Sequence, residues 1–171
     1  MGEKITEAQA ADLLALLRTD ASIDNKVAQI NSVKSGIKQN NVPDSCVSNL
    51  FEITRTSMTS QHAALVHAGF STLNHLLTRL SRQEPKHIVK EVARTLPLVV
   101  EKLGDQKEKY RLLATQCLTT FWKASPVDVE RAVRNSAMTG KNPRAKETSL
   151  QWLVQVCPAL IMLIHCSRYK D

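Results

Sequence analysis

Basic side chains gather in two short polar segments, and each segment precedes an apolar helical pattern. The segments read LGDQKEKYR and TGKNPRAKE. Their cations are Lys107, Lys109, Arg111, Lys141, Arg144 and Lys146. The helix dipole disfavours cations at a helix start, so each segment is either a solvated turn or a binding surface kept for its function. Lys and Arg donate charge-assisted hydrogen bonds to carboxylates, and recognition of an acidic partner is therefore the predicted chemistry.

The residues around these cations predict how the two turns are held. Gly104 is expected to end a helix in the left-handed conformation, and Asp105 to cap the helix that follows. Asn142 is expected to cap the last helix, with Pro143 at its first position. Such a cap would fix the backbone that carries Arg144 and so fix the direction of its side chain.

The sequence contains no pattern typical of an enzyme. It has no Gly-rich phosphate loop, no HExxH and no GxSxG. Cys157, His165 and Cys166 invite a zinc interpretation, but their spacing matches no standard finger and the residues between them are mostly apolar. We therefore expect no catalysis, no cofactor and no metal. The same apolar run is too short to cross a membrane, so no membrane contact is expected.

Helices must position these residues, because apolar side chains recur at helical spacing through most of the chain. Polar breaks near residues 21, 59, 105 and 142 are separated by about 38, 46 and 37 residues. This spacing predicts a single all-α domain over 1–171, an α-solenoid of about four HEAT-like helical hairpins. The hairpins are expected at about 5–40, 43–83, 86–124 and 126–156, with a divergent helix at 157–171. A plain helical bundle is the alternative, and the matched spacing of the breaks favours the solenoid.

The turns inside the hairpins of a solenoid lie along one edge of the array. The segments 22–26, 60–62, 104–109 and 140–146 should therefore form a narrow ridge, which adds Gln61 and His62 as polar contact candidates. Trp122 and Trp152 fall on apolar stripes and are expected in the core. Pro97 lies inside a helical pattern and is expected to kink the helix or start it afresh.

The overall charge also points to an acidic partner. The formal net charge is +7 and the isoelectric point is about 9.4. Nucleic acid would suit this charge, but aromatic residues make up only 4% of the chain and no nucleic-acid motif is present. Nucleic acid is therefore disfavoured as a partner.

Two segments resemble a known family. LPLVVEKLGDQKEKYRLLATQCL resembles the third repeat of TOG domains, the tubulin-binding HEAT arrays of microtubule regulators. GKNPRAKETSLQWL resembles the turn of the fourth repeat, and VSNLFEITRTSMTSQHAALVHAGFSTLNHLLTRL is similar to the second repeat of the CLASP branch. Over roughly residues 8–156 the chain looks like the N-terminal TOG-like domain of a fungal-type CLASP.

The resemblance implies a non-enzymatic regulator that stabilises microtubules and supports spindle assembly and kinetochore attachment. It implies tubulin or microtubules as partner and a location on the cytoskeleton and spindle, with the nucleus and kinetochore as further locations. It strengthens the contact prediction for Lys107, Arg144 and Lys146. The full set of candidate contact residues on the ridge is Lys107, Lys109, Arg111, Lys141, Asn142, Arg144, Lys146, Gln61 and His62.

Two departures from the family pattern are visible. The family commonly places a tryptophan in the first turn, whereas this chain reads TDASIDNKV there, so a scaffold for a kinetochore or adaptor protein is the alternative function. A complete TOG domain has six repeats, so the resemblance also implies a shortened array. The apolar residues 153–166 are expected either to self-associate or to pack back onto the fourth hairpin.

Overall fold

The computed structural model describes residues 4–156, and every regular element in that range is helical. The α-helices are α1 (Glu7–Leu17), α2 (Ile23–Gln39), α3 (Asp44–Met58), α4 (Ala63–Gln83), α5 (Lys86–Glu101), α6 (Glu108–Ala124), α7 (Pro126–Thr139) and α8 (Pro143–Val156). A short 3-10 helix, η1 (Lys102–Gly104), follows α5. The all-α prediction is confirmed.

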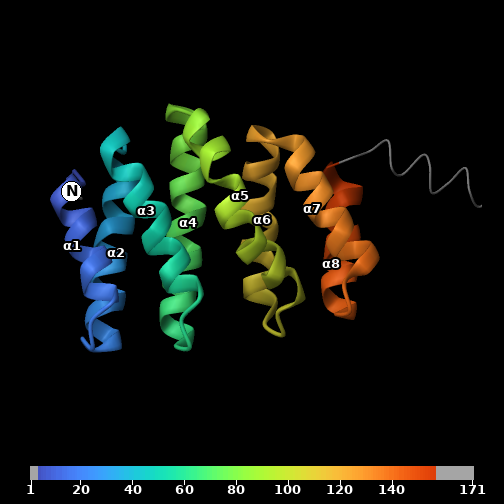
Figure 1. Ribbon diagram of the computed structural model, residues 1–171, viewed down its shortest axis with the longest axis horizontal. Coiled ribbons are helices and arrows are strands. Elements are labelled where there is room, and N and C mark those ends of the chain that lie inside the picture. The colour runs from blue at the N-terminus through green and yellow to red at the C-terminus, as the bar shows by residue number, and fades with distance from the viewer. Residues whose placement is uncertain (1–3, 157–171) are drawn as a thin grey trace, which may run out of the picture.

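Consecutive helices pair as antiparallel hairpins, and the hairpins stack side by side in chain order (Figure 1). Helices α1, α3, α5 and α7 pack on one another as one layer, which we call the odd layer. Helices α2, α4, α6 and α8 form the second, or even, layer. The helix contacts lie within one hairpin or between neighbouring hairpins, as in a solenoid. The solenoid prediction is therefore confirmed, and the bundle alternative is wrong.

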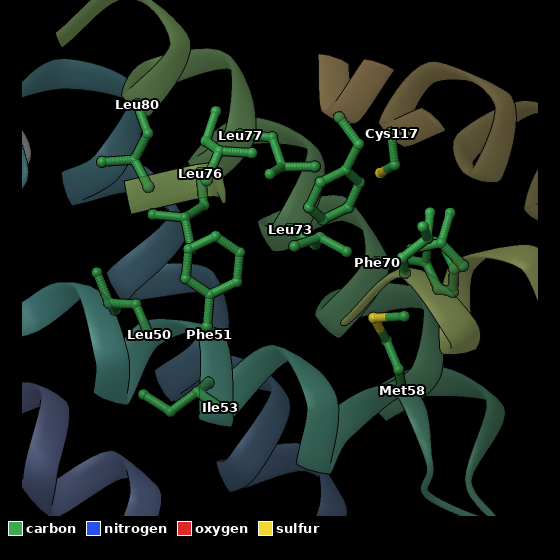
Figure 2. Close-up of a cluster of buried hydrophobic side chains, with 14 of the residues drawn as sticks. Leu50, Phe51, Ile53, Met58, Phe70, Leu73, Leu76, Leu77, Leu80 and Cys117 are labelled. Carbon is green, nitrogen blue, oxygen red and sulfur yellow. The ribbon is translucent and has the colours of Figure 1, made fainter. Parts of the chain in front are cut away.

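The largest part of the core lies between α3 and α4. Leu73, Leu76, Leu77 and Leu80 of α4 are fully buried, and they lie with Phe51 of α3 and Cys117 of α6 in one cluster (Figure 2). Their spacing puts them on one side of α4, and burying each such side chain contributes about 1.5–3 kcal/mol. A single hairpin cannot cover this stripe, so α4 is packed against α2, α3 and α6 together.

Gly69 lets α3 and α4 approach closely. A Cβ atom at this position would lie 2.6 Å from the Cβ atom of Ser57, closer than real Cβ atoms approach other atoms. The glycine is therefore selected by packing between the two helices.

A buried ion pair joins α3 to α5. Arg55 Nη1 lies 2.5 Å from Glu91 Oε2 and donates to Thr95 Oγ1 at 3.0 Å, and Nη2 lies 2.7 Å from Glu52 Oε2. The residues Arg55 and Glu91 are only 8% and 9% exposed. The hydrogen bond from Arg55 lowers the pKa of Glu52. Because each buried charge has its partner, this cluster sets how α3 and α5 pack in the odd layer.

Helix α5 runs through Pro97 to Glu101 without a break, so the predicted restart at this proline is wrong. Pro97 itself is exposed, whereas Leu96 and Val99 on either side are buried. Their packing keeps the helix intact despite the missing N–H group.

The last hairpin leaves large apolar side chains exposed. Met138 of α7 is 76% exposed and Leu150 of α8 is 47% exposed. The divergent helix at 157–171 lies outside the described residues, as does most of the segment 153–166, so their predicted roles stay predictions.

The ion pair at Arg55 yields a stability prediction. We expect Arg55→Ala to lower the free energy of unfolding by about 3 kcal/mol, because it leaves the buried carboxylate of Glu91 without its partner. Urea unfolding followed by circular dichroism measures the change. Arg94→Ala is the matched control, since the Arg94 side chain is 62% exposed and lies 3.6 Å from Glu52. We expect it to change stability by less than about 0.5 kcal/mol. Equal effects of the two variants would contradict the role given to Arg55.

Candidate protein-binding edge

The four turns inside the hairpins lie along one edge of the array, at the bottom of Figure 1. They comprise residues 18–22, 59–62, 102–107 and 140–142, and we call them turns 1 to 4. The connections between hairpins lie at the opposite edge. The arrangement places the predicted contact residues of turns 2, 3 and 4, and of the helix starts that follow them, on the same side.

Turn 4 is organised by the side chain of Asn142. Its Oδ1 accepts hydrogen bonds from the backbone N–H of Arg144 at 3.0 Å and of Ala145 at 3.4 Å, so it caps α8 as predicted. Its Nδ2 donates to the carbonyl oxygen of Gly104 at 3.0 Å. One side chain thus starts the last helix and ties turn 4 to turn 3, so Asn142 is a positioning residue.

Gly104 is required for this connection. A Cβ atom at Gly104 would overlap Nδ2 of Asn142. Our expectation of a left-handed conformation at this residue is wrong, because none of the described glycines has a positive φ. The absence of a side chain lets the two turns touch. Next to it, Asp105 Oδ1 accepts the N–H of Lys107 at 2.9 Å. Lys107 is the N-cap of α6 and no side chain caps that helix, so the expectation that Asp105 is its cap is wrong.

Arg111 holds the backbone of turn 3. Its Nη1 donates to the carbonyl oxygens of Asp105 at 2.8 Å and of Gln106 at 3.0 Å. The structure therefore adds an internal role for a residue that we predicted as a contact. Its cation remains near the edge, but its direction is fixed by the turn.

Tyr110 is a functional candidate that our sequence reasoning missed. Its hydroxyl donates to the carbonyl oxygen of Ala63 at 3.1 Å, which joins the start of α6 to the start of α4. The Nζ atoms of Lys107 and Lys109 lie 6.0 and 5.2 Å from its ring centroid, within cation–π range. Burial raises the pKa of this hydroxyl, which stays neutral and keeps donating. The sequence signal was an aromatic between the cations of KEKYR.

The remaining predicted residues of the edge are polar groups, and all of them except Lys146 are exposed. Gln61 and His62 of turn 2 are exposed, and the backbone N–H of His62 donates to Ser60 Oγ at 3.1 Å. Lys141 and Arg144 are exposed and Lys146 is half-buried. Within residues 4–156, no ion pair occupies the side chains of these last three cations.

Turn 1 differs from the others. Lys26 is 8% exposed, and its Nζ donates to the carbonyl oxygens of Leu17 at 3.2 Å and Thr19 at 2.6 Å. The Lys26 cation thus bonds to backbone carbonyl oxygens that the end of α1 leaves without a partner inside the helix. Residues 18–22 contain no aromatic side chain, so turn 1 offers no apolar anchor.

Comparison with known proteins gives the family. The model of the CLASP N-terminal family matches residues 6–160. The chain belongs to this family. It is 61% identical over 155 residues to Protein stu-1 of Neurospora crassa, an alignment that covers 91% of this chain and 14% of the relative. It is 62% identical over 153 residues to Protein STU1 of Gibberella zeae, covering 90% of this chain and 13% of that protein.

The resemblance to fungal CLASPs is thus confirmed, and the chain spans about a seventh of the length of these curated relatives. No solved structure gives a significant match. Among residues 4–156, no helix has the length and hydropathy needed to cross a membrane. The same part of the chain holds no cluster of three metal-ligating side chains. Cys157, His165 and Cys166 lie outside it.

The contact between turns 3 and 4 can be tested by a double-mutant cycle. We expect Asn142→Ala to lower the free energy of unfolding by about 1–2 kcal/mol, through loss of the helix cap and of the bond to Gly104. Gly104→Ala should also destabilise the protein by about 1–3 kcal/mol, because its methyl group overlaps the Asn142 amide.

The double variant shows whether Asn142 and Gly104 depend on each other for stability. In the Asn142→Ala background the amide is gone, so Gly104→Ala should be at most about half as harmful as in the wild type. Urea unfolding of the four proteins measures the coupling. Strictly additive effects would show that the two residues do not depend on each other.

Proposed function

We propose that turns 2 to 4 form a docking edge for an acidic protein partner, and that this partner is tubulin. In this proposal the chain is the TOG-like part of a non-enzymatic microtubule regulator. It acts on the cytoskeleton and spindle by helping to stabilise microtubules. Family membership supports the proposal, as does the arrangement of cations along the edge.

One observation carries the proposal. Lys107, Lys109, Lys141, Arg144 and Lys146 lie on two adjacent turns and the helix starts after them, and within residues 4–156 no carboxylate pairs with any of their side chains. Internal hydrogen bonds of Asn142, Arg111 and Tyr110 hold the backbone that carries them. Cations presented on a fixed backbone lose less entropy when they pair with carboxylates, and they steer an acidic partner during encounter.

A second candidate function is scaffolding of a kinetochore or adaptor protein, which would place the chain at the kinetochore or in the nucleus. It is favoured by turn 1, where Lys26 is folded inward and no aromatic anchor is present. The docking edge would bind this partner through the same cations. The two candidate functions therefore differ in which acidic protein binds there.

Tubulin binding tests the first candidate directly. We expect Arg144→Glu/Lys146→Glu to weaken binding of the chain to tubulin at least tenfold, since two attractions become repulsions on the edge. Fluorescence anisotropy at several salt concentrations measures the affinity. The affinity of the wild type should fall as salt rises, because exposed charges are screened.

Lys86→Glu/Lys90→Glu is the matched control. It makes the same change in net charge at exposed positions of α5, at the opposite edge of the array. We expect its affinity to remain within about twofold of the wild type. Equal binding by wild type and the Arg144/Lys146 variant, or no binding by either, would refute tubulin docking at this edge.

A further inference from the structure

The two helix layers carry different charge. The even layer holds ten Lys and Arg residues against three Asp and Glu residues. The odd layer holds six Lys and Arg residues against eight Asp and Glu residues. The positive net charge of the chain is therefore concentrated in one layer of helices, and helix α4 contains no acidic residue at all.

The ion pairs follow the same division. Each ion pair found within residues 4–156 joins residues of the odd layer, of η1 or of the connecting segments. The cations of the even layer form none in that part of the chain. Odd-layer cations other than Lys90 are thus paired with a carboxylate. Even-layer cations have no carboxylate partner there, although Lys26, Arg79 and Arg111 donate to backbone carbonyl oxygens.

Six of the even-layer side chains gather on α2, α4 and the start of α6, and we call them the basic patch. They are Lys34, Lys38, His67, His75, Arg82 and Lys109. Lys34 reaches across to α4, where its Nζ donates to Ser71 Oγ at 3.5 Å. Lys38, His75 and Arg82 line a hollow of about 200 Å³ between α2 and α4.

The pKa values of the two histidines reflect the positive charges around them in the patch. Burial lowers the pKa of His75, and Lys38 and Lys34 lower it further. Burial also lowers the pKa of His67, with Lys109 and Lys34 adding to the effect. Lysines from α2 and α6 therefore act on the same strip of α4, which makes the patch one continuous electrostatic surface.

We propose that the basic patch binds an extended, glutamate- and aspartate-rich segment of a partner protein. The hydroxyl and amide groups of Ser71, Asn74 and Gln116 lie along the same strip and suit the backbone groups of an extended chain. The distance from His67 to Arg82 along α4 is about 22 Å at 1.5 Å per residue, the reach of about seven extended residues.

Nucleic acid fits this surface less well. Tyr110, whose ring contacts that of His67 in the patch, is 4% exposed, so the tyrosine ring is not available for base stacking. Bidentate phosphate recognition favours arginine, and Arg82 is the one arginine among the six patch residues. Arg79, which also lines the hollow, donates to the carbonyl oxygens of Ile37 and Lys38. The patch also goes beyond the docking edge, because all its residues except His67 and Lys109 lie away from the turns.

The experiment uses a fluorescent peptide of about ten glutamates, with the chain titrated against it at low salt. Lys34→Glu/Lys38→Glu should weaken binding at least tenfold, and the neutral pair Lys34→Gln/Lys38→Gln should weaken it about threefold to tenfold. Circular dichroism checks that both variants are folded. The neutral pair supplies the answer if the charge reversal disturbs folding.

Two controls separate the patch from general charge and from the docking edge. Lys86→Glu/Lys90→Glu has the same i, i+4 spacing and charge change on α5 in the odd layer, and it should bind the peptide within about twofold of the wild type. Arg144→Glu/Lys146→Glu should also bind the peptide within about threefold, so the patch is tested independently of tubulin docking.

Three outcomes would overturn the proposal. The first is no binding of the glutamate peptide by the wild type. The second is an equal loss of binding in the α2 and α5 variants. The third is tighter binding of a short DNA duplex than of the peptide, with that binding lost in the α2 variant.

Discussion

The structure depends on one packing constraint, the apolar stripe of α4. Leu73, Leu76, Leu77 and Leu80 can be removed from water only if α2, α3 and α6 all pack on α4. This requirement joins three hairpins into an array and places their turns at one edge (Figure 1). The position of the proposed docking edge is therefore a consequence of core packing, because the same contacts that stabilise the solenoid align its turns.

Specific polar contacts then convert the aligned turns into a connected surface. Tyr110 joins the start of α6 to the start of α4, and Asn142 joins turn 4 to Gly104 in turn 3. Both side chains are polar groups satisfied inside the protein, and the cations stand on the backbone that they hold. The stability of the helix start and the shape of the surface are linked at these residues, since the loss of Asn142 would loosen both together.

Much of the fold could be predicted from sequence, because apolar spacing and the recurrence of polar breaks determine which helices form and how they stack. Asn142 could also be predicted as a helix cap, because it directly precedes Pro143. The internal use of Lys26 and Arg111 was not, since sequence does not show which carbonyl oxygens a long side chain will reach. Nor did it show why residue 104 is a glycine, because the reason is a side chain 38 positions away.

In the proposed function, turns 3 and 4 together contact tubulin. Hydrogen–deuterium exchange of the chain, with and without saturating tubulin, tests it most directly because it maps contact without changing a residue. We expect slower exchange at residues 104–110 and 140–146 in the complex, with little change at the start of α5 and of α7 at the opposite edge. Unchanged exchange at both turns in a saturated complex would contradict it.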